Sequence, residues 1–207
     1  MNNYVITVAR ETGSAGLQVT RRLSKELNIP FYDRDLLRLA SEVSGITVQR
    51  FKEADEQIGV KEMMSAAEKV YTGEVLPPDS DDFISSRNLF SFQAKVIREL
   101  ADQESCIILG RCANYLLRNH PNVLRVFIRA PLSVREGHIA EVHTEWSFQE
   151  VADYLKAEDK RRADYYHYYT GEEWRDVSGY DLVLDFDKLG EAGCATAIQQ
   201  MLPFFCK

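Results

Sequence analysis

Residues 4–16 read YVITVARETGSAG, and this stretch decides the fold. Its first six residues are β-branched, aromatic or small, a pattern typical of a short buried strand. Gly13 and Gly16 mark a turn, and three leucines at helical spacing follow between residues 17 and 27. The stretch therefore predicts a strand, a glycine turn and a helix.

Short apolar runs recur along the rest of the chain and alternate with helical patterns. Strands that are connected through helices pair in parallel, and a parallel sheet needs helices on both faces. The sequence therefore predicts an α/β fold with a five-stranded parallel sheet, in which the first strand is central. The predicted strands cover residues 4–9, 30–32, 106–109, 123–128 and 181–186.

Capping residues locate several helices. Asp33 is placed to cap a helix that Gly45 ends. Ser147 and Glu150 have the spacing of a capping box, and Gly171 ends the helix that they open. Other segments complete the pattern. Helices are expected over residues 46–71, 83–103 and 191–202, and a loop over residues 72–82 (TGEVLPPDSDD).

The composition is that of a globular protein of 207 residues, with 45% hydrophobic and 28% charged residues. No apolar run is long enough to span a membrane, so we expect a cytoplasmic protein without a membrane partner. The net charge of −7 argues against a nucleic-acid partner. The four cysteines have no zinc-ligand spacing, so no protein-held metal is expected.

Arginine is concentrated between residues 106 and 135, where five arginines occur without any Asp or Glu. The carboxyl ends of parallel strands meet at one edge of a sheet, which is where ligands bind in such folds. Arginine matches the geometry of phosphate, so we expect an anion site at this edge. A solvated basic surface is the alternative. The five residues are Arg111, Arg118, Arg125, Arg129 and Arg135.

Five stretches carry a family resemblance by their order and spacing. They are residues 6–37, 102–117 (DQESCIILGRCANYLL), 124–136 (LRVFIRAPLSVRE), 158–174 (EDKRRADYYHYYTGEEW) and 180–190 (YDLVLDFDKLG). Together they resemble the cytidylate-kinase-like family, relatives of the P-loop nucleoside monophosphate kinases. The resemblance implies one P-loop kinase-like domain over residues 1–207, with a phosphate loop. It also implies a monophosphate-binding helical insertion over residues 46–90 and an arginine-rich lid over residues 137–175.

The resemblance also implies roles for particular residues. The phosphate loop would be residues 13–16, and Arg111 would hold the acceptor monophosphate. Asp159 and Arg162 match a pair on the lid helix, and Arg135 lies where the family has an arginine near the lid hinge. The expected catalytic residues are Arg111, Arg135 and Arg162; the expected ATP-binding residues are Arg10, Gly13, Ser14, Ala15, Gly16, Leu17, Gln18 and Arg21; the expected substrate-binding residues are Asp33, Arg34, Arg38, Arg111, Asp159 and Arg162.

The phosphate loop departs from the pattern GxxxxGK[ST]. With Gly16 as the second glycine, Leu17 takes the place of the loop cation, and the magnesium-binding hydroxyl falls at Gln18 or the residue after it. Arg21 lies one helical turn beyond Leu17, and helical side chains lean towards the N-terminus, so Arg21 is a candidate for the missing charge. Arg10 is the other candidate.

The function implied by the resemblance is a nucleotide kinase. It would transfer the γ-phosphate of ATP to a CMP-like nucleoside monophosphate or a related small phosphorylated acceptor, with ATP and Mg²⁺ as cofactors and no identified Mg²⁺ ligands. Cys112 and Leu155 replace the family's aspartate and lid arginine, which leaves the base of the acceptor open. Because Leu17 removes a loop charge, a non-catalytic nucleotide-binding sensor or partner module is the alternative. Nucleotides are the expected partners, and the sequence leaves a homodimer open.

Overall fold

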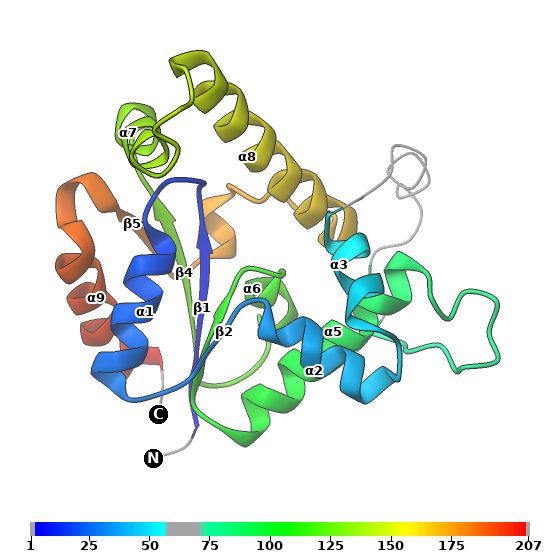
Figure 1. Ribbon diagram of the computed structural model, residues 1–207. Helices are drawn as coiled ribbons and strands as arrows, with labels where there is room; N and C mark the ends of the chain where they lie inside the picture. Colours follow the sequence, from blue (N-terminus) through cyan, green and yellow to red (C-terminus); the bar gives the residue numbers. More distant parts are fainter. Residues whose placement is uncertain (1–2, 57–70, 72, 206–207) are drawn as a thin grey trace.

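The computed structural model describes residues 3–56, 71 and 73–205 (Figure 1). In this part of the chain, the strands form one parallel sheet. They are β1 (Val5–Arg10), β2 (Phe31–Tyr32), β3 (Cys106–Leu109), β4 (Val123–Arg129) and β5 (Leu182–Asp185). Their order across the sheet is β2-β3-β1-β4-β5, and every pairing is parallel. The predicted α/β fold and the central first strand are confirmed.

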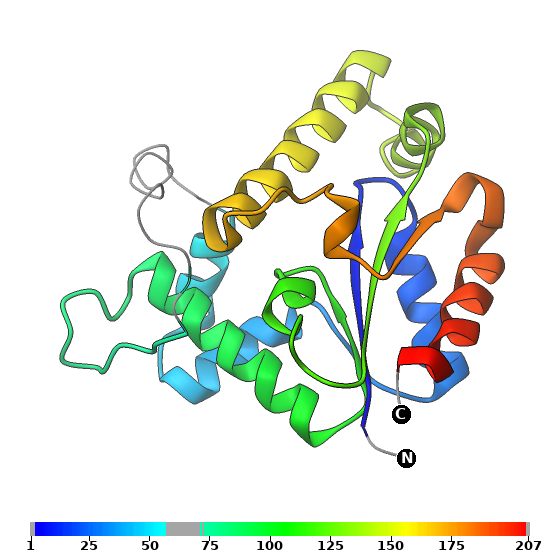
Figure 2. The same cartoon turned by 180° about the vertical axis from the view of Figure 1, so that it is seen from behind.

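Helices cover both faces of the sheet, as Figure 2 shows from behind. One face packs against α1 (Gly16–Leu27) and α9 (Phe186–Phe205), which contact each other. The other face is covered mainly by α5, on which α2 and α3 pack, and by the short α6. The bounds of these helices are α2 (Asp35–Ser44), α3 (Val48–Glu56), α5 (Ser86–Gln103) and α6 (Ala113–Leu116).

The central strand β1 is buried on both faces, because its side chains alternate between two cores. Ile6 and Val8 pack into the core under α1 and α9, and both are fully buried. Val5 and Ala9 pack into the core under α5. Arg10 continues the row of Ile6 and Val8 at the end of the strand, so its side chain starts on the face that α1 covers.

Two helices, α7 (Leu132–Val142) and α8 (Phe148–Thr170), lie beyond the carboxyl ends of the strands and pack on each other (Figures 1 and 2). The predicted capping box is present at the start of α8: the Ser147 hydroxyl accepts from the Glu150 N–H, and the Glu150 carboxylate accepts from the Ser147 N–H. Gly171 ends the helix at φ +73°, a left-handed conformation that costs glycine little.

The start of α2 differs from the prediction. Arg34, not Asp33, precedes the first turn, and its side chain makes no capping hydrogen bond. The Asp33 backbone carbonyl accepts hydrogen bonds from Arg111 Nε and from the Leu36 N–H, which fix the chain between β2 and α2. The predicted end of this helix at Gly45, with φ +74°, is confirmed.

The last helix also starts elsewhere than predicted. It begins at Phe186, directly after β5, rather than near residue 191. The Asp185 carboxylate accepts a hydrogen bond from the Asp187 N–H at 3.1 Å, which turns the chain into the helix at once. Gly190, with φ +62°, kinks the helix just before the predicted start.

The expected insertion over residues 46–90 is described only in part. Helix α3 confirms the helical pattern at its start, whereas residues 57–70 and 72 lie outside the described residues. Residues 73–85 contain no helix or strand, which confirms the described part of the predicted loop. Asn88 of α5 holds this loop: its Oδ1 accepts from the Leu76 N–H and its Nδ2 donates to the Phe83 carbonyl, both at 2.8 Å.

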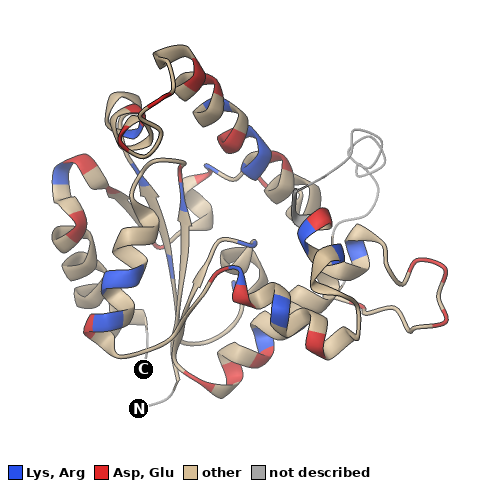
Figure 3. Ribbon diagram, in the orientation of Figure 1, with Lys and Arg blue, Asp and Glu red and all other residues tan. Residues whose placement is uncertain are grey.

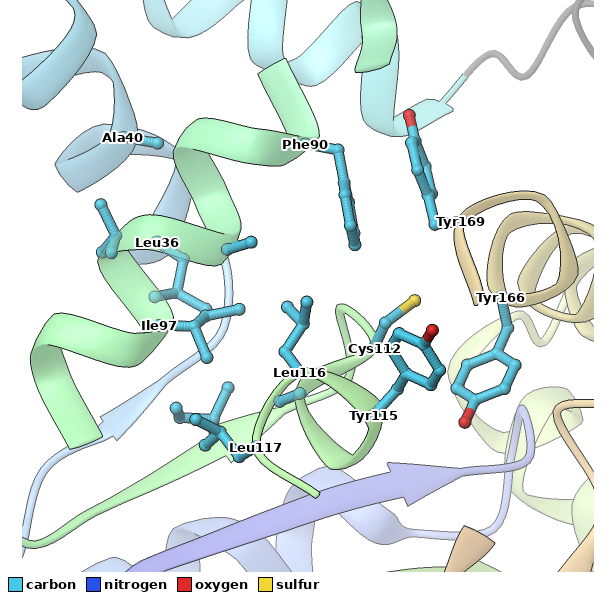
Figure 4. Packing of buried hydrophobic residues seen from close by; sticks show 14 of the residues in the cluster. Leu36, Ala40, Phe90, Ile97, Cys112, Tyr115, Leu116, Leu117, Tyr166 and Tyr169 are labelled. Atoms are coloured by element: carbon cyan, nitrogen blue, oxygen red, sulfur yellow. The ribbon is translucent and has the colours of Figure 1, made fainter. Parts of the chain in front are cut away.

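Phe90 joins α5 to the end of α8. It is 1% exposed, and its ring stacks on Tyr169 with centroids 3.9 Å apart (Figure 4). We expect Phe90→Leu to lower the free energy of unfolding by about 1–2 kcal/mol, because the stacked pair is lost and a small cavity remains. Urea unfolding measures this. Phe204→Leu is the control, since Phe204 is 73% exposed, and equal stability of both variants would contradict the prediction.

Candidate functional site

A pocket of about 280 Å³ lies at the carboxyl edge of the sheet, between the ends of β1 and β3, the start of α2 and one side of α8. Its lining is strongly basic. Two carboxylates, those of Asp33 and Glu158, accompany five guanidinium groups. We call this cavity the arginine pocket. Its arginines are Arg10, Arg34, Arg111, Arg161 and Arg162.

A sharp turn after β3 places Arg111. Gly110, Arg111 and Cys112 all have positive φ values, of 80°, 55° and 55°. Such backbone is strained for residues other than glycine, and strained residues of this kind cluster at functional sites. The Arg111 Nε donates to the Asp33 carbonyl at 3.0 Å, and its Nη1 donates to the Gln93 Oε1 at 3.2 Å. The guanidinium is thus oriented before any ligand binds.

One face of α8 forms the opposite wall of the pocket. Tyr154, Glu158, Arg161, Arg162 and Tyr165 recur every three or four residues, so they share that face. Figure 3 shows the basic run in the middle of this helix. Arg162 Nη1 donates to the backbone carbonyl of the last residue of β1 at 2.9 Å. Arg161 pairs with Glu158 at 2.9 Å. Arg162 therefore ties the helix to the central strand, whereas the pair of Arg161 lies within the helix.

The charge of the pocket is not balanced by the protein. Burial and the nearby guanidinium groups of Arg162 and Arg111 lower the pKa of Arg10 to about 9, and Asp33 opposes this shift. The group stays protonated at neutral pH. Burial also lowers the pKa of Arg162. Several cations held together in this way would be stabilised by an anion, which relieves their repulsion.

The glycine loop between β1 and α1 lies beside the pocket. Ala15 precedes α1 with φ 59° and no side chain caps the helix. In the described chain, the N–H groups of Gly16, Leu17 and Gln18 have no hydrogen-bond partner. Free N–H groups and the helix dipole make such an end suited to a phosphate.

A buried ion-pair network holds the first part of this loop. The Asp159 carboxylate of α8 accepts from the Thr12 N–H at 2.8 Å and from Arg135 Nη1 at 2.6 Å. Arg175 reaches the same carboxylate at 2.8 Å and pairs with Glu11 at 3.0 Å. Asp159 and Arg135 are 7% and 8% exposed. The network connects the loop, α7 and α8.

The structure places the site residues predicted from the sequence in several parts of the molecule. Arg10, Asp33, Arg34, Arg111 and Arg162 line the arginine pocket. Arg135 and Asp159 belong to the neighbouring network instead. Residues 13–18 form the loop and the start of α1, outside the pocket lining. Two expected residues, Arg21 and Arg38, are exposed on helices away from that lining, and Arg38 pairs with Glu42.

The sequence analysis missed part of the pocket. Glu158 and Arg161 have a signal, since they lie at helical spacing from the expected Arg162. Asn114 and Trp174 have none, because they come from α6 and from the segment after α8. Tyr165 and Tyr166 of α8 line the pocket as well as the core.

The comparisons with known proteins agree with this geometry. The model of the cytidylate kinase-like family matches residues 5–188. The chain belongs to this family. The cytidylate kinase of Methanosarcina barkeri (strain Fusaro / DSM 804) is 28% identical over 183 residues, which cover 88% of this chain and 87% of that protein. The cytidylate kinase of Methanothrix thermoacetophila is 26% identical over 189 residues, covering 91% and 92%.

Solved structures show the fold of this family member. An uncharacterized protein from Eubacterium ventriosum ATCC 27560 superposes with a TM-score of 0.70 at 23% identity, over 97% of this chain and 99% of that one. The shikimate kinase from Bacteroides thetaiotaomicron superposes with a TM-score of 0.52 at 14% identity, over 97% and 98%. The chain therefore has the fold of P-loop kinases.

The structure shows where the two residues that depart from the family pattern lie. Leu155, in place of a lid arginine, is 1% exposed and packs in the interior. Cys112, in place of an aspartate, lines the arginine pocket. Among the described residues, no three His, Cys, Asp or Glu side chains are grouped as metal ligands, and no helix is long and apolar enough to cross a membrane.

Proposed function

We propose that this chain is a nucleoside monophosphate kinase, which transfers the γ-phosphate of ATP to CMP or a CMP-like acceptor. The observation that carries the proposal is the arginine pocket, which adjoins the free N–H groups at the start of α1. A kinase of this class needs two anion sites side by side, one for each phosphorylated substrate. The named relatives act on cytidylate, which favours CMP as the acceptor.

In this proposal the acceptor phosphate binds in the arginine pocket. Arg111 presents its guanidinium fork to two phosphate oxygens, and Arg162 and Arg34 add positive charge. Tyr154 and Trp174 provide ring surfaces against which the nucleoside can lie. In the same proposal, the described part of residues 46–90 belongs to the acceptor site, and residues 137–175 act as the lid.

The phosphates of ATP bind at the start of α1 in the same proposal, because the N–H groups of Gly16, Leu17 and Gln18 are available there. Phosphoryl transfer depends on alignment of the two phosphates and on neutralisation of the charge of the transferring group. The described residues hold no set of metal ligands. A Mg²⁺ ion that accompanies ATP would be bound mainly by phosphate oxygens and water, as is usual for this ion.

A second candidate function has one observation in its favour. The Thr12 N–H, in the first part of the loop, donates to Asp159 rather than being free for a phosphate. A loop held by protein carboxylate suits a nucleotide-binding sensor or partner module that catalyses no transfer. Both functions predict that the chain binds nucleotides, but only the kinase predicts turnover.

The test is a screen of monophosphates with ATP and Mg²⁺, with products separated by nucleotide chromatography. We expect CDP and ADP to form from CMP faster than the corresponding products from AMP, GMP or UMP. CMP at 100 times its Kd should also stabilise the fold by about 2.7 kcal/mol. In a chain of this length, that raises Tm by roughly 5–10 °C. Binding without turnover would favour the sensor, and neither binding nor turnover would contradict both.

A further inference from the structure

We propose that Arg10 supplies the phosphate-loop cation, by laying its side chain across Gly16 towards the arginine pocket. The inference rests on the proposed kinase function and names a catalytic residue for it. In the sequence analysis Leu17 occupies the cation position of the loop. We instead place Gly16 at the cation position and Arg10 at the position of the first glycine, so that the glycine and the cation have exchanged places.

The backbone favours this register. In the pattern GxxxxGK[ST] the loop joins a strand to a helix, and glycine is required where the backbone is left-handed. Here the strand ends at Arg10, the loop is left-handed at Gly13 and at Ala15, with φ 77° and 59°, and the helix begins at Gly16, directly after the second of them. If Ala15 occupies the second glycine position, Gly16 occupies the position of the cation and Arg10 that of the first glycine.

The space above Gly16 is filled by the Arg10 side chain. A Cβ atom on Gly16 would lie 2.6 Å from Arg10 Cβ and 2.8 Å from its Cγ. Carbon atoms that are not bonded do not approach so closely, so only glycine fits at position 16 while the Arg10 side chain keeps this conformation. The volume that a loop cation would occupy at position 16 is thus taken by the aliphatic part of Arg10.

A second glycine receives the other end of the side chain. A Cβ atom on Gly110 would lie 2.6 Å from Arg10 Nη1. The guanidinium therefore rests on the turn that carries Arg111, between the start of α1 and the arginine pocket that it lines. The Arg10 side chain thus passes over Gly16 and ends against Gly110, which carries its charge from the end of β1 to the arginine pocket.

The guanidinium of Arg10 is available for a ligand. Among the described residues, no acceptor makes a hydrogen bond or ion pair with it, whereas Arg162 binds only its backbone carbonyl. Its charged surroundings are Arg162, Arg111 and Arg161, opposed by Asp33. An anion placed between loop and pocket would be the missing partner.

The place of this cation fits a role in transfer. The bond from the γ-phosphorus to the β–γ bridging oxygen breaks and leaves ADP, while a new bond forms from the γ-phosphorus to an oxygen of the acceptor phosphate. No proton has to move, because that oxygen is already ionised. Arg10 contacts the transferring phosphoryl group and neutralises charge on its equatorial oxygens.

Arg21 is the rival source of the charge. It is exposed on α1 and does not line the arginine pocket, whereas Arg10 does. The neighbouring Arg22 pairs with Glu26 at 2.7 Å and provides a matched control on the same helix. The three arginines therefore allow a direct comparison.

The experiment measures kcat for CMP phosphorylation and Kd for ATP in variants of the full chain. We expect Arg10→Ala to lower kcat by about 10³-fold or more, by analogy with the loss of an arginine finger. Arg22→Ala should stay within about twofold of the wild type. The exchange variant Arg10→Gly/Gly16→Lys, which moves the cation to its usual position in the loop, should recover at least about tenfold of the lost rate. Gly16→Ala should lower kcat, because its methyl group displaces Arg10.

Several outcomes would overturn the inference. They are a kcat for Arg10→Ala within about threefold of the wild type, a larger loss in Arg21→Ala, or a folded Gly16→Ala variant with wild-type kcat. If Arg10→Ala does not fold, Gly16→Ala and the exchange variant decide the result. If the wild type transfers no phosphate, the kinase proposal fails by itself. The affinity for tripolyphosphate then tests Arg10: a tenfold loss in Arg10→Ala supports the inference, and an unchanged Kd overturns it.

Discussion

Asp159→Ala is expected to lower the free energy of unfolding by about 3–5 kcal/mol, the usual cost of removing one partner from a buried ion pair. Its carboxylate is the common acceptor of the Thr12 N–H, Arg135 and Arg175. Without it, the buried Arg135 guanidinium keeps only its longer contact with Glu11, at 3.7 Å, and the Thr12 carbonyl. Urea denaturation of both proteins measures the difference.

Asp164→Ala is the matched control on the same helix. Asp164 pairs with Lys160 four residues away, and the Lys160 side chain is 68% exposed. A pair of this kind contributes about 0.3–0.5 kcal/mol, so the control should be close to the wild type. If Asp159→Ala were as stable as Asp164→Ala, the network would not hold the loop to α8.

The sheet is predictable from the sequence because its strands are buried on both faces. The run CIIL of β3 contains no charged residue, and all four side chains are buried. The glycine turn and the long helices carry similarly local signals. The start of α9 could not be predicted in the same way, since it depends on a hydrogen bond from Asp187 to Asp185.

The arginine pocket is predictable in part, because the residues that follow parallel strands meet at one edge. Arg10, Arg34 and Arg111 are found in this way. Partners from distant segments have no such signal. Asp159 lies 147 positions from Thr12, and only the packing of α8 above the sheet brings the two together. For the same reason the sequence does not predict that Arg135, expected as a catalytic residue near the lid hinge, pairs with Asp159.

The register of the phosphate loop shows how a motif can mislead. Counting from Gly16 as the second glycine places the cation position on Leu17. The left-handed backbone of Ala15 favours a count that is shifted by one residue. Such a shift cannot be read from letters alone, because alanine rarely adopts that conformation.

Arg111→Ala is expected to lower kcat/KM for the acceptor monophosphate by about 10²- to 10³-fold. Removal of one partner from a desolvated, hydrogen-bonded charge pair costs a few kcal/mol, which corresponds to this factor. The loss should appear mainly as a higher KM, because the guanidinium binds the acceptor before and during transfer. Arg111→Lys keeps the positive charge but loses the two parallel N–H donors, so its kcat/KM should lie between those of the wild type and Arg111→Ala.

Stability must be measured on the same variants, because Arg111 also binds the Asp33 carbonyl and Gln93. These two hydrogen bonds should cost about 1–3 kcal/mol when lost. Arg38→Ala is the control, since Arg38 is exposed, pairs with Glu42 and does not line the arginine pocket. Its KM should stay within about twofold of the wild type. An Arg111→Ala variant with lower stability and an unchanged KM would show that Arg111 braces the turn after β3 and does not bind the acceptor.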